Sequence, residues 1–177
     1  MSNFNKHIYL IGFMGTGKSQ VSKELGDVME LKVLDTDTFI EDISGISIPE
    51  IFEQKGEDYF RTIETKVLQK IATSDSSIVS CGGGIAVKDE NVEIMKKSGK
   101  VILLTASAEN IYIRVKSDTQ RPLLKNNMNV KYIEGLMKKR QAAYEKAADI
   151  IVNTDDKDIL QICQEIVLKL RIMEGTE

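Results

Sequence analysis

Short apolar segments recur along the chain, and each is followed by a turn or by a stretch with helical spacing. They are continuous apolar runs, with no alternation of apolar and polar residues, which is typical of strands covered on both faces. The intervals between the runs are long enough for crossover helices. The five runs are Ile8–Ile11, Val33–Leu34, Ile78–Val79, Val101–Leu104 and Ile150–Val152. The pattern therefore predicts an α/β fold built on a parallel sheet.

Two of the intervening segments carry apolar stripes at a spacing near 3.6 residues, over residues 60–71 and 159–170. Such stripes predict helices that bury one face against the sheet. Only Pro49 and Pro122 interrupt the chain, and we find no internal repeat or low-complexity block. Residues 1–177 are therefore expected to form a single domain.

The composition narrows the class of protein. The chain has 177 residues, of which 42% are apolar and 29% charged, and its net charge is −3. A chain of this length can build a core without disulfides or structural metal, and its balance argues against a disordered tail or a nucleic-acid coat. Cys81 and Cys163 match no metal or disulfide spacing, so we expect thiols in a reducing compartment. No export signal or membrane-length apolar run is present, which predicts a cytoplasmic protein that needs no membrane.

The first apolar run leads into Gly12–Ser19, which matches the pattern G-x-x-x-x-G-K-S/T and precedes a helix-compatible stretch. Small residues let backbone N–H groups surround phosphate oxygens, and the start of the helix adds partial positive charge. Lys18 is then expected to reach the β- and γ-phosphates, and Ser19 to offer its hydroxyl to Mg²⁺. An ordinary glycine-rich turn is the alternative. The predicted nucleotide-binding residues are Gly12, Gly15, Thr16, Gly17, Lys18 and Ser19.

Acidic and glycine-rich segments follow the next two runs, where a parallel sheet opens its carboxyl edge toward ligands. Asp35 and Asp37 can serve a metal site and an acceptor, although Asp-Thr-Asp-Thr is also a good N-cap sequence. The three glycines Gly82–Gly84 imply close approach of the backbone to another group, with a loose connecting loop as the alternative.

Two arginines lie on predicted helices. Arg61 can pair with Glu57 or Glu64 at helical spacing, and Arg140 can be one more solvated cation beside its lysine neighbours. Taken singly, each arginine therefore has an adequate structural explanation.

One stretch differs in charge from the rest of this acidic protein. Between Arg114 and Arg140 there are eight basic residues and two acidic ones, which indicates a polyanionic ligand or, alternatively, a solvated surface. Its middle, residues 121–130, contains a proline and a run rich in asparagine, which predicts an irregular mobile lid.

Together these motifs resemble the shikimate kinase family along nearly the whole chain. The ordered set is Gly12–Ser19, Asp35–Asp37, Phe60–Arg61 with Glu64, Gly82–Gly84, Arg121–Leu124, and Arg140 with Tyr144. The resemblance implies a three-layer α/β/α P-loop kinase fold with strand order 2-3-1-4-5 and a lid at about residues 114–130. It also implies transfer of the γ-phosphoryl group of ATP to the 3-hydroxyl of shikimate, in aromatic amino-acid biosynthesis. The cofactor would be Mg²⁺, the partners would be these small molecules and no nucleic acid, and the protein would be a monomer.

The same resemblance implies residue roles. Lys18, Asp37 and Arg121 would be catalytic, with Asp37 contacting the acceptor hydroxyl and Arg121 the transferring phosphates. Arg114 would pack on adenine, and Asp35 would join Ser19 near the magnesium. The shikimate-binding region would lie at about residues 35–64. The residues of the shikimate site would be Asp37, Phe60, Arg61, Gly82, Gly83, Gly84 and Arg140.

One departure from the family pattern concerns the nucleotide base. Family members often carry a proline in the loop after the last strand, whereas residues 153–159 contain none. We therefore expect the adenine contact to be made differently in this chain.

Two other classes of protein remain as alternatives. A gluconate or nucleoside monophosphate kinase would share the phosphate loop and the lid, but Phe60–Arg61, the three glycines and Arg140 disfavour its acceptor pocket. A nucleotide-dependent switch of the GTPase type would ordinarily carry an N-K-x-D motif, which this sequence lacks.

Overall fold

The fold is given by a computed structural model that describes residues 6–116 and 129–175. In this part of the chain, one parallel sheet has the strand order β2-β3-β1-β4-β5. Its strands are β1 (His7–Ile11), β2 (Lys32–Asp35), β3 (Ser77–Ser80), β4 (Gly99–Thr105) and β5 (Ile150–Asn153). Each apolar run of the sequence lies in one of these strands, and the predicted order is confirmed.

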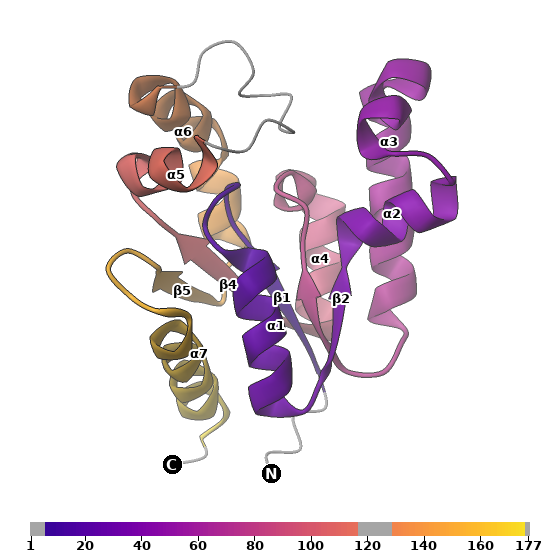
Figure 1. The fold of residues 1–177 in the computed structure, drawn as a ribbon. Helices are drawn as coiled ribbons and strands as arrows, with labels where there is room; N and C mark the ends of the chain where they lie inside the picture. Colours follow the sequence, from indigo (N-terminus) through magenta and orange to yellow (C-terminus); the bar gives the residue numbers. More distant parts are fainter. Residues whose placement is uncertain (1–5, 117–128, 176–177) are drawn as a thin grey trace.

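Helices cover both faces of the sheet and complete the predicted three layers (Figure 1). They are α1 (Lys18–Met29), α2 (Thr36–Ser44), α3 (Ile48–Ala72), α4 (Asp89–Ser98), α5 (Ala108–Val115), α6 (Val130–Ala147) and α7 (Ile159–Glu174), with a 3-10 helix η1 (Ile85–Val87) before α4. Helices α1 and α7 pack on one face, and α3, α4 and α6 pack on the other.

The central strand β1 shows why the strands are apolar throughout. All five of its residues are buried, and successive side chains point to opposite faces. Ile8 and Leu10 join the core beneath α1 and α7, whereas Tyr9 and Ile11 join the core beneath α3 and α4. A strand covered on both faces has no position for a solvated side chain, so alternation is absent.

Local signals set where the helices begin. Asp158 and Gln161 form a capping box at α7, and Ser47 and Glu50 form another at α3. Pro49 lies in the first turn of α3, where the missing N–H costs no helical hydrogen bond. Helix α3 is interrupted at Gly56, whose φ of 80° breaks the helical path.

The structure describes only the two ends of the segment predicted as a lid. Helix α5 includes Arg114, and α6 already begins at Val130. Both ends of the predicted range 114–130 are therefore helical or capping residues, and residues 117–128, with Arg121 among them, lie outside the described residues.

Parallel strands bring their carboxyl ends to one edge of the sheet. The glycine-rich segment Gly12–Ser19, called the phosphate loop below, follows β1. Asp35 ends β2, the three glycines follow β3 and Thr154 follows β5. Segments that are far apart in sequence therefore meet at that edge, which is where ligands bind in open α/β sheets.

Candidate functional site

The loop after β1 has the backbone geometry of an anion cradle. Gly12, Gly15 and Gly17 have φ values of 146°, 79° and 92°, which disfavour residues with a Cβ. The hydroxyl of Thr16 donates to the Phe13 carbonyl (2.8 Å) and closes the loop. Helix α1 starts with glycine as its N-cap, so no side chain covers the backbone N–H groups of its first turn. These N–H groups, with the partial positive charge of the helix start, favour a bound anion.

Lys18 lies against this cradle. Its ammonium donates to the carbonyl oxygens of Gly12 (2.8 Å) and Phe13 (3.0 Å). The positive charge is therefore already beside the loop, while Ser19, the next residue, is exposed at the start of α1. The loop, Lys18 and Ser19 occupy the relative places that the sequence predicted.

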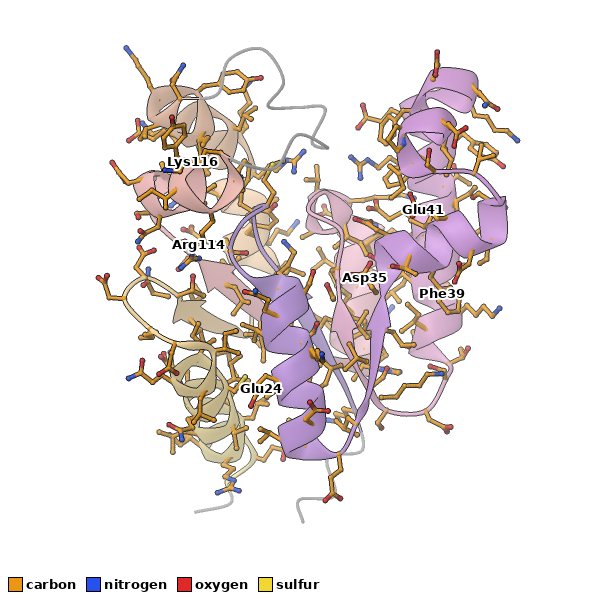
Figure 2. All side chains as sticks on the ribbon, in the orientation of Figure 1. Glu24, Asp35, Phe39, Glu41, Arg114 and Lys116 are labelled. Carbon is orange, nitrogen blue, oxygen red and sulfur yellow. The ribbon has the colours of Figure 1, made fainter. Side chains whose placement is uncertain are left out.

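Asp35 is the N-cap of α2, as one of the two interpretations of the sequence required. Its Oδ1 accepts hydrogen bonds from the backbone N–H groups of Asp37 (3.0 Å) and Thr38 (3.1 Å). These bonds use one of its two carboxylate oxygens. Figure 2 shows Asp35 at the junction of β2 and α2, on the opposite side of the phosphate loop from Arg114.

Asp37 lies two residues further on, in the first turn of α2, and has an unusual environment. Burial, reinforced by the negative charge of Asp35, raises the pKa of its carboxyl from 3.8 to about 6, although Lys18 opposes the shift. A carboxyl with a pKa near 6 is ionised at neutral pH and can still accept a proton. The structure therefore places a carboxyl with a raised pKa close enough to Lys18 of the phosphate loop to be influenced by its charge.

Arg61 makes the ion pairs that its helical spacing predicted. Its Nε (3.3 Å) and Nη2 (3.1 Å) donate to Glu57, which is 65% exposed, while its Nη1 donates to Glu64 (3.0 Å), which is 1% exposed. Burial raises the pKa of Glu64, and so does the charge of Asp37, while Arg61 opposes the shift. The buried Glu64 thus fixes one edge of the guanidinium, and the edge toward Glu57 faces solvent.

Phe60 is part of the core. Its side chain is buried and packs on Phe52, with ring centroids 4.8 Å apart, and the guanidinium carbon of Arg61 lies 5.1 Å from its ring centroid. Phe60 therefore anchors this part of α3 in the core and lies next to the guanidinium of Arg61.

The three glycines after β3 bring the other residues together. A Cβ on Gly82 would lie 2.5 Å from Asp37 Oδ1, and one on Gly84 would collide with the guanidinium of Arg61. The carbonyl of Gly83 accepts hydrogen bonds from Arg140 Nη1 (3.1 Å) and from the hydroxyl of Tyr144 (2.5 Å). The close approach that the glycines implied is therefore present, and the alternative of a loose loop is wrong.

Buried polar residues hold this glycine loop in place. The hydroxyl of Thr36, which is fully buried, accepts from Gly82 N (2.8 Å) and ties the loop to the start of α2. Asn91, also fully buried, donates to the Ile85 carbonyl (3.0 Å) and accepts from the Thr65 hydroxyl (2.9 Å) on α3. No pattern in the sequence marked these residues.

A pocket of about 510 Å³ adjoins the phosphate loop on the side of α1 and α7. Thr16 and Gly17 form its floor, Gln20 and Glu24 of α1 line one wall, and the loop after β5 forms another. Arg114 reaches it from α5 (Figure 2) and donates to Gly15 O, Thr154 Oγ1 and Thr154 O at 3.1–3.2 Å. Sequence reasoning located Arg114 but missed Thr154 and its neighbour Asp155.

Neither cysteine takes part in a disulfide. Cys81 and Cys163 are both buried free thiols, as predicted. In the described residues, no helix combines the length and apolar character needed to cross a membrane.

The raised pKa of Asp37 predicts a pH-dependent stability. Because the folded-state value lies above the ordinary 3.8, the contribution of this carboxyl is greatest below about pH 4 and is lost as the pH rises through about 6. Asp37→Asn should therefore gain free energy of unfolding relative to the parent between pH 4 and pH 6, by on the order of 2 kcal/mol. Urea unfolding at several pH values measures the difference.

Asp42→Asn, on the exposed side of the same helix, is the matched control. The difference between control and parent should stay constant across this pH range. A constant difference for Asp37→Asn as well would show that the carboxyl is not perturbed by its surroundings.

Comparison with known proteins gives a consistent family. The family model described as shikimate kinase matches residues 14–171. A shikimate kinase from Sulfurihydrogenibium sp. is 42% identical over 166 residues, which cover 94% of this chain and 98% of that protein.

Similar solved structures include members of the same family. A shikimate kinase from Acinetobacter baumannii in complex with shikimate has a TM-score of 0.88 and 32% identity, covering 98% of this chain and 95% of that one. One from Aquifex aeolicus has a TM-score of 0.82 and 35% identity, covering 97% and 99%. A gluconokinase from Sinorhizobium meliloti, with a TM-score of 0.60 and 14% identity, covering 96% and 94%, shares only the fold.

Proposed function

Because the chain belongs to the shikimate kinase family, it is an ATP-dependent kinase that phosphorylates the 3-hydroxyl of shikimate, and we propose that the transfer takes place where the phosphate loop meets the glycine loop Gly82–Gly84. One observation carries this proposal. Asp37 of α2, Arg61 of α3 and Arg140 of α6 all contact or adjoin these three glycines, beside the phosphate loop. A proton acceptor and two cations therefore face the end of a triphosphate held in the cradle.

The phosphate half of the site holds ATP. Backbone N–H groups of residues 12–19 surround the phosphates, and Lys18 moves its ammonium from the loop carbonyls to the β- and γ-phosphate oxygens. Phosphoryl transfer asks the protein mainly for alignment and charge neutralisation, which these groups supply. Arg121, which we propose to add a further positive charge, lies outside the described residues.

The donor chemistry at the edge of this loop fits Mg²⁺. The Ser19 hydroxyl and the second carboxylate oxygen of Asp35 are hard oxygen ligands, and Mg²⁺ commonly takes only one or two protein ligands beside phosphates and water. Among the described residues, no cluster of three or more His, Cys, Asp or Glu side chains forms a self-sufficient metal site. We therefore propose that Ser19 holds the ion directly and Asp35 through water. Bound there, Mg²⁺ would neutralise charge on the β- and γ-phosphates.

The acceptor half holds the carboxylate of shikimate between two arginines. The Nε and Nη2 edge of Arg61 is bonded to the exposed Glu57, and exposed ion pairs of this kind contribute little, so a substrate carboxylate can replace Glu57. Glu64 keeps the guanidinium oriented during the exchange. Arg140 donates to the Gly83 carbonyl of the same glycine loop. Charge-assisted bonds from both arginines favour an acid over an uncharged polyol.

Asp37 orients the acceptor. Its carboxylate accepts a hydrogen bond from the 3-hydroxyl, the new bond forms between that oxygen and the γ-phosphorus, and the bond from the γ-phosphorus to the β–γ bridging oxygen breaks. The hydroxyl proton passes to Asp37, whose pKa of about 6 lets it take the proton and release it near neutral pH.

We also propose a cytoplasmic, monomeric enzyme. Two unpaired buried thiols support a reducing compartment.

The first prediction of this assignment concerns the acceptor. With Mg-ATP, ADP release should be slow without an acceptor and accelerate by orders of magnitude with shikimate. The ring of shikimate holds its carboxylate and its 3-hydroxyl at a fixed separation, so that both arginines and Asp37 can be met together. Gluconate and nucleoside monophosphates are the comparison acceptors. If shikimate gives no acceleration over the blank, the assignment fails.

The second prediction separates the two halves of the site. Asp37→Asn should keep ATP binding and lose at least a hundredfold in kcat, whereas Arg140→Ala should mainly raise the KM for shikimate, by about tenfold or more. Steady-state kinetics with each substrate varied measures both effects. Lys139→Ala removes an exposed cation from the same helix and should match the parent. Equal turnover by Asp37→Asn and the parent would remove Asp37 from this role.

The third prediction tests the glycine loop directly. A Cβ on Gly84 occupies space that the Arg61 guanidinium now fills, so Gly84→Ala should displace Arg61 and raise the KM for shikimate by roughly tenfold. The KM for ATP should change less than twofold, since the phosphate loop is untouched. Gly135→Ala, on α6, is the control, because a Cβ there meets nothing within 4 Å. An unchanged shikimate KM for Gly84→Ala would show that Arg61 does not bind the acceptor.

A further inference from the structure

The first turn of α5 is bonded to the loop that follows β5. Asp155 Oδ2 accepts a hydrogen bond from the backbone N–H of Ser107, the N-cap of α5, and its Oδ1 accepts one from Asn110 Nδ2, both at 2.8 Å. The partners are 45 or more positions apart in sequence. A single carboxylate in the β5–α7 loop therefore holds the start of α5.

The last turn of α5 is bonded to the same loop and also to the phosphate loop. Arg114 donates to both oxygens of Thr154 and to the Gly15 carbonyl. Val115 packs so closely on Gly15 that a Cβ on the glycine would lie 2.8 Å from it. Helix α5 therefore links the β5–α7 loop to the phosphate loop, and both segments line the same pocket.

The β5–α7 loop has few other fixed points beyond the sheet. Thr154 is buried and its N–H and hydroxyl both donate to Thr105 O, but Asp156 has a φ of 56° and turns the chain away. The contacts of Lys157 stay within β5 and α7, since its ammonium donates to Asn153 O and Glu165. Asp155 therefore ties this part of the loop to the first turn of α5, while Thr154 is bonded to the last turn through Arg114.

The same loop lines the pocket of about 510 Å³ beside the phosphate loop. Thr154, Lys157 and Asp158 face Gln20 and Glu24 of α1 across it. The position of the loop therefore sets the distance from the amides of the phosphate loop to the far wall of the pocket.

We propose that Asp155 is a positioning residue for the nucleotide: by fixing α5 to the β5–α7 loop, it sets the span between the phosphate cradle and the wall that contacts the nucleoside. This proposal rests on the proposed function, because it takes the pocket to be part of the ATP site. A ligand that reaches both walls, such as ADP, depends on Asp155. A ligand that fills only the cradle, such as pyrophosphate, does not.

Calorimetric titration of the whole protein with ADP and with pyrophosphate separates these cases. Asp155→Ala should raise the Kd for ADP about tenfold, because the loop is no longer held to the first turn of α5, and leave the Kd for pyrophosphate within about twofold. The KM for shikimate should also stay within about twofold. Asp156→Asn, which removes the neighbouring exposed carboxylate and keeps a residue type that tolerates positive φ, should match the parent.

Two further variants guard against a simple folding defect. Asn110→Ala removes one of the two bonds from the α5 side and should raise the Kd for ADP by about threefold, and adding it to Asp155→Ala should have little further effect. Asp155→Asn can keep both bonds if the Asn110 amide turns over, so it should restore most of the ADP affinity.

The outcomes are distinguishable. If the parent does not bind ADP, the proposed function fails. If the parent binds ADP but the Asp155 and Asn110 variants bind it equally well, or if ADP and pyrophosphate weaken together, the positioning role of Asp155 is wrong.

Discussion

The site depends on one steric constraint, the absence of side chains at Gly82–Gly84. Asp37 and Arg61 occupy the places where Cβ atoms of two of these glycines would lie, and the carbonyl of the third accepts bonds from Arg140 and Tyr144. Three helices, α2, α3 and α6, therefore contribute to one small volume at the end of β3. With larger residues in this loop, the acid and the two cations would be pushed apart, and the substrate could not meet them together.

Gathering charges in this way places ionisable groups in an unfavourable environment. Burial is the main cause of the raised pKa values of Asp37 and Glu64. The charge of Asp35 raises the pKa of Asp37 further, and the charge of Asp37 does the same for Glu64. Arg61 compensates Glu64 directly, through a 3.0 Å ion pair, while the charges of Lys18 and Arg61 oppose the shift at Asp37 without cancelling it. Burial and neighbouring acids therefore keep the pKa of Asp37 raised, as is common for groups at functional sites.

Much of this arrangement could be predicted from the sequence because it depends on neighbouring residues. Continuous apolar runs predicted the strands, because strands covered on both faces are apolar throughout. The glycine pattern of residues 12–19 predicted the phosphate loop, because its backbone has positive φ values that favour glycine. The close approach at Gly82–Gly84 was also predicted, but its partners could not be derived from spacing, because they come from three other elements. The capping interpretation of Asp35 is confirmed by the two hydrogen bonds to its Oδ1, while its role near a metal ion stays a prediction.

Long-range polar contacts were beyond sequence reasoning. Asp155 meets Ser107 and Asn110 only after β4 and β5 have paired, and nothing within the loop itself marks that contact. Phe60 was expected both in the apolar stripe of residues 60–71 and beside the acceptor; its side chain is in the core and also lies next to the Arg61 guanidinium. The periodicity that predicted a helix did not tell which of its residues would reach the edge of the site.

The central claim is that the glycine loop holds Asp37, Arg61 and Arg140 around one acceptor, in line with the phosphate loop. A crystal structure of the protein with shikimate, Mg²⁺ and a non-hydrolysable ATP analogue tests it most directly. Our account predicts the carboxylate bonded to both arginines and the 3-hydroxyl within hydrogen-bond distance, about 3 Å, of Asp37. Shikimate bound with its carboxylate away from Arg61 and Arg140, or its 3-hydroxyl away from Asp37, would contradict the account.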